Sequence, residues 1–364
     1  MRRIWGVGVA VLAVAALAFT AVAAADSPAS AGHLKHVFVI VLENHSKNGV
    51  IGDVNTPYIT SLANEYGVAG NYYGVTHPSE PNYVAMIGGS NFGKNSDNPS
   101  LRYDAPNLVD QLEATGHTWD AYEESLPSVG YTGDYWPSRS NALYASKHNP
   151  FVLFNDIRND PARLAHVKPY TSLATDLNSG SAPDFAFIVP NQCHDMHGGV
   201  YTPVAADGSD GSPCPYGATN DDANDASLKQ KADAFVKQAV QTIMSSKAWS
   251  GNSAIFIVAD ESDYNGNAEN GGWADASGCC DSPVVPAGDP SVSPSWPGGV
   301  YGGGLSPAIV VTTNGPRHYV STTPYNHYSL LTTIEQNWHL GYLGNAGDTA
   351  GGVVPMNDLL GPGA

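Results

Sequence analysis

The sequence predicts an α/β fold, a three-layer sandwich in which helices cover both faces of a mostly parallel central sheet. Four continuous apolar runs predict the strands: His36–Leu42, Phe185–Val189, Ala254–Ala259 and Ala308–Val311. Uninterrupted runs of this length are typical of parallel strands that are buried on both faces. Amphipathic helical patterns lie between the runs, and this alternation favours a parallel sheet with covering helices.

Three helices are the clearest. Apolar residues recur at 3.6-residue spacing within Ala232–Met244, directly before the third strand. A second helix passes through Leu112 and ends at Gly116, a favourable C-terminal cap. The third is predicted over Ser329–His339, with Gly341 closing it.

Composition indicates a folded chain with one large domain. Of 364 residues, 42% are hydrophobic and only 14% are charged, which excludes a disordered protein. No internal repeat and no domain linker is visible. Residues 199–228 and 261–306 are rich in Gly, Ser, Asp, Asn and Pro, and they are predicted to be long loops. Residues 26–364 are therefore expected to form a single catalytic-size domain.

Residues 1–25 have the pattern of a secretory signal peptide. Arg2 and Arg3 form a basic start, an apolar stretch runs from Ile4 to about Val22, and small residues precede Asp26. The alternative is an uncleaved membrane anchor, because the stretch almost reaches membrane-spanning length. We expect cleavage and a secreted, extracellular protein. No later segment is expected to cross a membrane.

The four cysteines fit an exported protein. Disulfides form in oxidising compartments, and four cysteines allow three pairings that the sequence cannot distinguish. Cys193 with Cys214 is the simplest local pair. Cys279 and Cys280 are adjacent, so they either bond to each other or take separate partners. No CxxC spacing suggests a cysteine metal site.

The net charge limits the partners. The formal charge is −18, and removing residues 1–25 takes away two arginines and no acids, which leaves −20. Such a surface argues against binding nucleic acid and offers no polybasic patch for a membrane. An anionic substrate would need a bound cation or a local group of histidines.

Polar residues follow three of the predicted strands directly. The first strand runs into Glu43-Asn44, and the third runs into Asp260-Glu261. The second is followed by Asn191, Asp195 and His197. Ligands of open α/β sheets bind beyond the carboxyl ends of the strands, so these side chains could converge on one cation. The alternative is that each merely caps a turn, which Asp and Asn often do.

Ser79 is a second focus. It precedes Glu80, Pro81 and an apolar helical run, which marks a helix start. In the simpler interpretation Ser79 is only an N-cap. In the functional one it is a nucleophile, placed where a helix N-terminus attracts an anion and activated by a neighbouring metal.

The histidines carry weaker signals. His327 precedes the last helix and could bind metal or phosphate, although a single histidine there is more often a cap or a buried hydrogen-bonding group. His77, two residues before Ser79, is a lesser candidate, and His148 and His166 have still weaker cases.

Five segments together resemble the bacterial phosphoesterase family. They are HVFVIVLENHS, THPSEPNYVAMIGG, IVPNQCHDMHGG, IFIVADESD and YNHYSLLTTIEQNWHLG, in the family's order along nearly the whole mature chain. The family groups certain acid phosphatases with phosphocholine-type phospholipases C, and it belongs to the alkaline-phosphatase-like superfamily. The chain resembles the compact secreted acid phosphatase branch more than the phospholipases C. That branch includes phosphatidylinositol-3-phosphatases.

The resemblance implies a role for each matching residue. It implies metal ligation by the two strand-end pairs and the serine, and catalysis by the serine with two histidines. Four further residues are candidates for substrate binding. The metal ligands would be Glu43, Asn44, Ser79, Asp260 and Glu261; the catalytic residues Ser79, His197 and His327; the substrate-binding residues His77, Asn82, Asn191 and Asp195. The oxygen-rich set favours Mg²⁺, Mn²⁺ or Ca²⁺, while the histidines also allow Zn²⁺ or iron.

The expected activity is therefore that of a metal-dependent phosphomonoesterase working through a phosphoserine. Its substrate would be a phosphorylated small molecule or a phospholipid head group. One departure bears on this expectation: family phospholipases often carry His-Gly-Gly soon after the second acidic pair, and here Ser262-Asp263-Tyr264-Asn265-Gly266 follows. A phospholipase C-type phosphodiesterase stays as the first alternative, and a non-catalytic secreted phosphate-ligand-binding protein as the second.

Overall fold

Eight strands form one central sheet in the computed structural model, which describes residues 1, 33–204, 212–217, 222–263, 275–292 and 295–360. Across the sheet the order is β12, β2, β11, β8, β1, β7, β3, β6. In this order the strands span Tyr319–Asn326, Gly67–Tyr73, Ala308–Thr312, Ser253–Ala259, His36–Leu42, Phe185–Val189, Trp119–Glu123 and Val167–Pro169. All four predicted strands are present, and the sheet is mostly parallel, as expected.

The direction of one strand differs from the prediction. β11 was expected to run parallel with the others, but it is antiparallel to both β8 and β2. Its apolar run reports burial on two faces, and a central antiparallel strand is buried in the same way as a parallel one. β2, with two glycines and an asparagine among its seven residues, has no continuous apolar run and escaped prediction.

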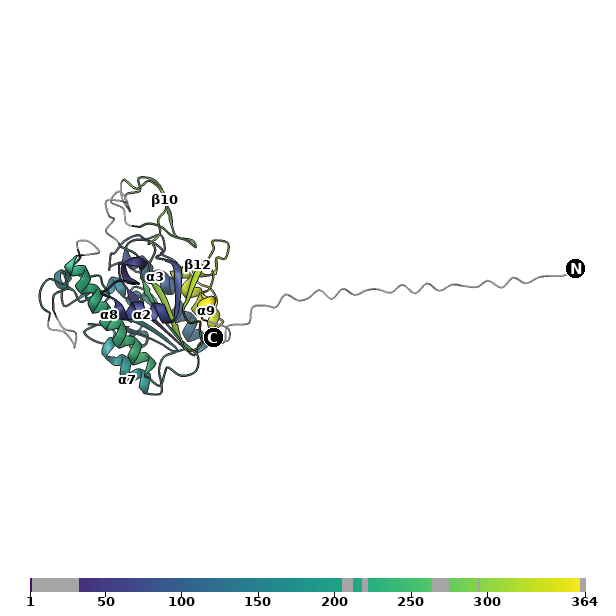
Figure 1. The fold of residues 1–364 in the computed structure, drawn as a ribbon, viewed down its shortest axis with the longest axis horizontal. Helices are drawn as coiled ribbons and strands as arrows, with labels where there is room; N and C mark the ends of the chain where they lie inside the picture. The colour runs from purple at the N-terminus through teal and green to yellow at the C-terminus, as the bar shows by residue number, and fades with distance from the viewer. Residues whose placement is uncertain (2–32, 205–211, 218–221, 264–274, 293–294, 361–364) are drawn as a thin grey trace. The chain divides into compact units, whose positions relative to one another are not determined.

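Two apolar layers sandwich the sheet. In β1, Val37, Val39 and Val41 join one core, while the alternate residues Phe38 and Ile40 join the other. The first core includes side chains of α3 (Ser79–Gly88), α4 (Leu108–Thr115) and α9 (His327–Asn337). The second includes those of α2 (Pro57–Glu65), α7 (Leu173–Asn178) and α8 (Ala223–Met244), which lie together beside the sheet in Figure 1. The predicted three-layer sandwich is confirmed.

The remaining elements are short. They are helices α1 (Lys47–Val50), α5 (Asn155–Arg158) and α6 (Pro161–Leu164), the strand pairs β4 (Tyr135–Trp136) with β5 (Tyr144–Ala145) and β9 (Val284–Val285) with β10 (Gly299–Val300), and the 3₁₀ turns η1 (Arg139–Asn141), η2 (Ser146–His148), η3 (Pro150–Val152), η4 (Tyr170–Ser172), η6 (Gly344–Gly347) and η7 (Asn357–Leu359). β9 and β10 interrupt one predicted long loop, and α8 begins inside the other.

Two of the three predicted helix ends are confirmed. α4 ends at Thr115 with Gly116 in the left-handed conformation, and α8 ends at Met244. The end predicted for α9 is wrong: the helix stops at Asn337, before Gly341. The chain turns at His339, whose φ is 54°, and the Leu340 N–H donates to the Glu335 carbonyl, so a non-glycine residue closes the helix.

Contacts gather residues Ala31–Ala364 into one compact unit, and the description here concerns that unit. Residues 2–25 of the predicted signal peptide lie outside the described residues, so its cleavage stays a prediction. Within the described part of the chain, no helix has the length and apolar character needed to span a membrane.

Candidate active site

Three neighbouring parallel strands deliver the acidic residues to one edge of the sheet. β1 lies between β7 and β8 and is parallel to both, so their carboxyl ends meet. Glu43 and Asp260 are fully buried there, and the Asn44 N–H donates to Asp260 Oδ1 over 3.2 Å. The Glu43 N–H donates to the carbonyl of Asp195, which joins the segment after β7 to the same edge. The predicted convergence of these strand ends is therefore present.

Ser79 lies at the centre of this group. It is the first residue of α3, and Pro78 rather than Ser79 occupies the cap position. The Ser79 hydroxyl donates to Glu43 Oε2 over 2.9 Å and lies 3.1 Å from Glu261 Oε1. A capping serine would accept hydrogen bonds from its own helix, and α3 has no side-chain cap. The interpretation of Ser79 as a simple N-cap is thus wrong.

The loop before Ser79 is held by Asn82. Its side-chain oxygen accepts from the N–H groups of Val75 and Thr76, and its amide donates to the carbonyls of Thr76 and Pro78. All four hydrogen-bonding positions of this amide are used inside the protein. The structure therefore places Asn82 as a support for the serine loop.

His77, from the same loop, pairs with Glu261. Its Nδ1 contacts the Glu261 carboxylate, and its Nε2 lies 3.0 Å from the Asp275 carbonyl. Both ring nitrogens face acceptors, and Glu261 raises the pKa of His77, although burial opposes a charge on the ring. Gly74, just upstream, packs so closely on the Asp260 carbonyl that a Cβ would lie 2.7 Å from it.

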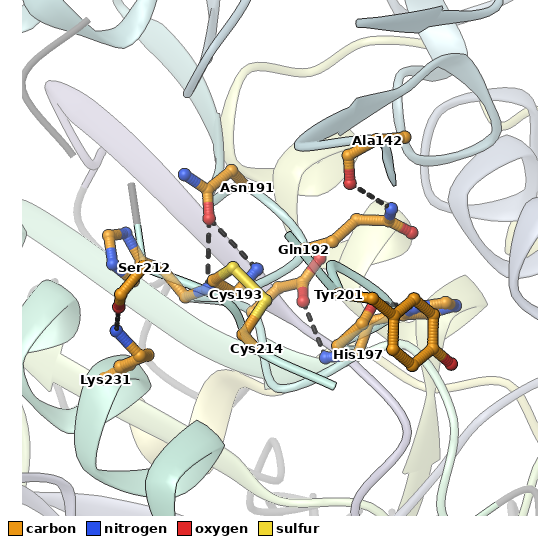
Figure 2. The surroundings of a disulfide bond; sticks show 12 residues. Ala142, Asn191, Gln192, Cys193, His197, Tyr201, Ser212, Cys214 and Lys231 are labelled. Atoms are coloured by element: carbon orange, nitrogen blue, oxygen red, sulfur yellow. Dashed lines mark hydrogen bonds between the residues drawn. A yellow bond between two sulfur atoms is a disulfide. The ribbon is translucent and has the colours of Figure 1, made fainter. Parts of the chain in front are cut away.

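A disulfide holds the segment that carries Asp195 and His197 (Figure 2). Cys193 bonds to Cys214, the simplest pair that the sequence offered, and Cys279 bonds to Cys280. Asn191 caps the turn after β7, since its side-chain oxygen accepts from the N–H groups of Cys193 and His194. Asp195 Oδ1 accepts from the His197 N–H over 2.7 Å.

Two buried residues outside the predicted site, Lys147 and the weak candidate His148, complete the group. Lys147 donates to Asp97 over 2.7 Å, and its Nζ lies 3.0 Å from His197 Nε2. Although burial lowers it, Asp97 and Glu43 raise the pKa of Lys147 above the usual value, so the amine stays charged. His148 lies 3.2 Å from Glu43 Oε1 and 3.4 Å from Asp195 Oδ2.

One signal could have found this pair. Lys147 and His148, with Ser146 and Asn149 on either side, interrupt a mainly apolar and aromatic stretch, 142–154, in a chain with few charged residues. A charge in such a stretch needs a partner. His148, stacked on Tyr83 with centroids 5.1 Å apart, had only a weak case in the sequence.

The two predicted catalytic histidines, His197 and His327, are both neutral, but they contact different parts of the site. Burial, with Lys147 contributing, lowers the pKa of His197 to about 3. Its Nδ1 lies 3.0 Å from the Gly198 carbonyl, so Nε2 presents its lone pair to Lys147. Burial lowers the pKa of His327 to about 4. Its nitrogens contact the Tyr72 hydroxyl and the Asp260 carbonyl, so the ring supports the strand end.

Several buried atoms at this edge have no hydrogen-bond partner among the described residues. They are Glu43 Oε1, Asn44 Oδ1, Asp195 Oδ2, Asp260 Oδ2 and His148 Nε2. Burial raises the pKa of Glu43 to about 8, although Lys147 opposes the shift, and burial likewise raises that of Asp260. Crowded, unpartnered oxygens are the donor set that a hard divalent cation would satisfy, so the residues fit a metal.

A second grouping of possible ligands overlaps the first. Glu43, His148 and His197 offer atoms within 4.8 Å of one another. His197 Nε2 contacts Lys147, whereas Asn44 Oδ1 and Asp260 Oδ2 have no hydrogen-bond partner within the described part of the chain. We therefore favour the oxygen-rich set that the sequence predicted.

The site opens into a cavity of about 740 Å³. Ser79, Glu261, Lys147 and His197 contribute to its wall. A cavity of this volume accommodates a molecule much larger than a phosphate ion.

Comparison with known proteins identifies the class. The sequence model of the Phosphoesterase family matches residues 53–209 and 214–341, a range that includes Ser79, Asp195, His197, Asp260, Glu261 and His327. The chain belongs to the Phosphoesterase family, as its motifs predicted.

Individual relatives agree with this class. The chain is 34% identical to the probable acid phosphatase of Kluyveromyces lactis over 49% of its own length and 42% of the relative. It is 35% identical to the phosphatidylinositol-3-phosphatase of Mycobacterium tuberculosis over 45% of its own length and 52% of the relative. It thus spans about half the length of these curated relatives. The solved murine ectonucleotide pyrophosphatase/phosphodiesterase 5 shares the fold, with a TM-score of 0.50 at 11% identity over 90% of this chain and 100% of that chain.

Proposed function

We propose that the protein is a secreted, metal-dependent phosphomonoesterase that forms a phosphoserine on Ser79. The observation that carries the proposal is the position of the Ser79 hydroxyl, which donates to Glu43 and lies beside Glu261 at the start of α3. Nothing in a cap or a core requires a serine between two buried carboxylates. A nucleophile that must lose its proton does require such acceptors.

Glu43, Asn44, Ser79, Asp260 and Glu261 would hold the cation. When bound, the cation would lower the charge density at the phosphoryl oxygens and make the serine hydroxyl more acidic. The unpartnered oxygens of Asn44 and Asp260 support this assignment. His148 is a further candidate ligand, since its Nε2 faces Glu43.

The residues of the chain then divide the reaction between them. Ser79 Oγ attacks phosphorus as its proton passes to a neighbouring carboxylate. The bond from phosphorus to the leaving-group oxygen breaks, and that oxygen takes up the proton. Lys147 is placed to donate to a phosphoryl oxygen, because its Nζ is charged and lines the cavity. In the second step water attacks phosphorus, the Oγ–phosphorus bond breaks, and one proton of that water passes to Ser79 Oγ.

The two histidines receive different roles in this scheme. We assign His197 to the phosphate pocket, since it lines the cavity and contacts Lys147. We assign His327 to positioning, because its contacts are Tyr72 and the backbone of Asp260. Among the predicted substrate-binding residues, Asp195 and His77 act through His148 and Glu261, while Asn82 and Asn191 hold loops.

The names of the relatives favour a monoester. Two relatives are described as an acid phosphatase and a phosphatidylinositol-3-phosphatase. We propose a phosphorylated small molecule or a phospholipid head group as substrate. A nucleic acid is disfavoured by the net charge of −18.

The test is a phosphate-release panel run from acidic to alkaline pH, with and without chelator. It compares p-nitrophenyl phosphate with bis-p-nitrophenyl phosphate and phosphatidylcholine. We expect monoester hydrolysis that is lost on metal removal and restored by Mg²⁺, Mn²⁺, Ca²⁺ or Zn²⁺. Diacylglycerol release without monoesterase activity would instead establish the phospholipase alternative, and activity that survives exhaustive chelation would contradict the metal site.

Ser79→Ala tests the nucleophile. We expect loss of turnover and loss of the phosphorylated peptide that acid quenching traps in the wild type. Ser146→Ala is the matched control, because Ser146 is equally buried and adjacent to Lys147, and its hydroxyl has no hydrogen-bond partner among the described residues. A wild type that cleaves no phosphoester, with an identical Ser79→Ala variant, would favour the non-catalytic alternative.

Export has a separate test. Expression in a secreting bacterial host and N-terminal sequencing of the protein from the medium should yield a chain that starts at Asp26. A protein retained in the membrane with residues 1–25 intact would favour the anchor.

A further inference from the structure

The cavity extends beyond the nucleophile to an exposed mouth. Its buried wall includes Ser79 and Lys147, and its exposed wall includes Arg139 on η1 and Tyr216 on the segment 212–217. A phosphoryl group at Ser79 would place its leaving group between these walls. The residues at the mouth therefore decide which leaving groups the site accepts.

Arg139 differs from the other described arginines. Arg102, Arg158, Arg163 and Arg317 each donate hydrogen bonds to the protein. The Arg139 guanidinium has no hydrogen bond or ion pair within the described residues, and its contact is the ring of Tyr135, with 5.9 Å to the centroid. A free guanidinium that lines an active-site cavity is available to a ligand.

The nearby acids do not use Arg139. Three carboxylates of the cavity wall have their own cations: Asp97 pairs with Lys147, Asp225 with Lys229, and Glu261 with His77. Asp263, the fourth acid of the wall, makes no hydrogen bond or ion pair with Arg139 within the described residues. Within the described residues the Arg139 guanidinium therefore has no ion-pair partner, and it lines the cavity that a ligand would enter.

The segment that carries Arg139 is anchored on both sides. Asn141 donates to the Thr202 carbonyl over 3.0 Å and accepts from the Tyr201 N–H over 2.8 Å. On the inner side, Gln192 donates to the Ala142 carbonyl over 2.6 Å, as Figure 2 shows. Gln192 precedes the disulfide-bonded Cys193, so η1 is tied to the same segment that carries His197. The position of Arg139 relative to the pocket is thus fixed by the fold.

We propose that Arg139 binds a second phosphate group on the substrate, located in the leaving group. The proposal rests on the proposed function and narrows its substrate class to phosphomonoesters whose leaving group itself carries a phosphate. A guanidinium pairs two N–H groups with two phosphate oxygens. The Tyr135 ring, which also lines the cavity, contacts the Arg139 guanidinium. The second phosphate has two possible sources, the phosphodiester of a phosphoinositide head group and the second monoester of a soluble bisphosphate.

The experiment compares four substrates on wild type and Arg139→Gln. Inositol 3-phosphate and p-nitrophenyl phosphate carry one phosphate. Inositol 1,3-bisphosphate supplies the soluble second phosphate, and dibutanoyl phosphatidylinositol 3-phosphate supplies the lipid diester in soluble form. Arg139→Lys keeps the positive charge but loses the paired N–H groups of the guanidinium. Lys247→Gln is the matched control, because it removes one exposed positive charge outside the cavity.

We expect Arg139→Gln to lower kcat/KM for the two-phosphate substrates by about tenfold or more, mainly through KM, as the loss of a charged hydrogen-bonding pair implies. The one-phosphate substrates and Lys247→Gln should be unchanged, and Arg139→Lys should fall between. A loss confined to the lipid substrate, or to the soluble bisphosphate, supports the proposal and identifies the source.

Equal loss on all four substrates, or no loss on either two-phosphate substrate, would overturn the role of Arg139. The role of Arg139 would also be overturned if the wild type showed no higher kcat/KM for the two-phosphate substrates than for the one-phosphate substrates. A wild type that hydrolyses none of the four substrates would instead refute the proposed function, so the two failures are distinguishable.

Discussion

Replacing Lys147 with methionine separates catalysis from stability at this site. The Nζ of Lys147 lies 2.7 Å from Asp97 Oδ2 and 3.0 Å from His197 Nε2, and the residue is buried. Methionine has a similar length and apolar stem, so it fills the same volume without the charge. The variant removes the cation that we place beside the transferred phosphoryl group.

Two effects of different size are expected. Loss of one preorganised cation or donor at a transition state costs about 10²–10³ in kcat. Loss of the partner of Asp97, whose side chain is 33% exposed, costs on the order of 1–3 kcal/mol of folding free energy. The catalytic loss should therefore exceed what partial unfolding can explain, because a stable domain tolerates a loss of that size.

The assay is kcat and KM for p-nitrophenyl phosphate, with urea unfolding of the same samples. The kcat of Lys147→Met should be lower than that of the wild type by a factor of at least about 10². Lys147→Met combined with Asp97→Asn should regain stability, since no carboxylate is left unpaired, while its activity stays low. Lys147→Arg should keep more activity than Lys147→Met.

Two results would refute this reasoning. If Lys147→Met keeps most of its kcat, the amine does not act on the phosphoryl group. If the double variant with Asp97→Asn recovers activity, Lys147 serves only to neutralise Asp97.

Three further predictions concern supports of the site and the core. Burial raises the pKa of Glu335 to about 8, so the native state holds a proton that the unfolded chain loses above about 4.5. The free energy of unfolding therefore falls as pH rises from about 4.5 to about 8. In urea unfolding, Glu335→Gln should raise it by on the order of a few kcal/mol near pH 8 but by almost nothing near pH 4. Replacing Cys193 and Cys214 together by serine opens a loop of separation 21 and should cost about 3 kcal/mol in the same assay, with a fall in kcat; unchanged kcat would show that the disulfide does not position the site. Asn82→Ala should lower kcat at least about tenfold, because the loop before Ser79 loses hydrogen bonds, and an unchanged kcat would remove that role.

The strand ends could be predicted because burial leaves a plain pattern. β1, β7 and β8 are continuous apolar runs, and the residues after them stand at the edge where a parallel sheet places its ligands. Glu43 and Asp260 were therefore found without a structure. The same pattern does not encode strand direction, and β11 was assigned the wrong one for that reason.

The rest of the site comes from irregular segments, where spacing carries little information. Lys147 and His148 belong to the 3₁₀ turn η2, and only tertiary packing brings them to Glu43 and Asp195. Asn82 shows the converse: a residue inside a functional motif can be occupied with its own backbone. Residue type and motif membership therefore locate a site better than they assign roles within it.

The antiparallel direction of β11 has a practical consequence for handling the protein. The strand carries the chain away from the acidic edge, since Thr312 pairs with Ala254 at the far end of β8. The exposed Asn314 follows there, beside Asn252. A surface-coupling tag or a fluorescent label attached at Asn314 would leave the cavity mouth facing solution. This position is the natural point for immobilising the protein on a sensor chip or a resin.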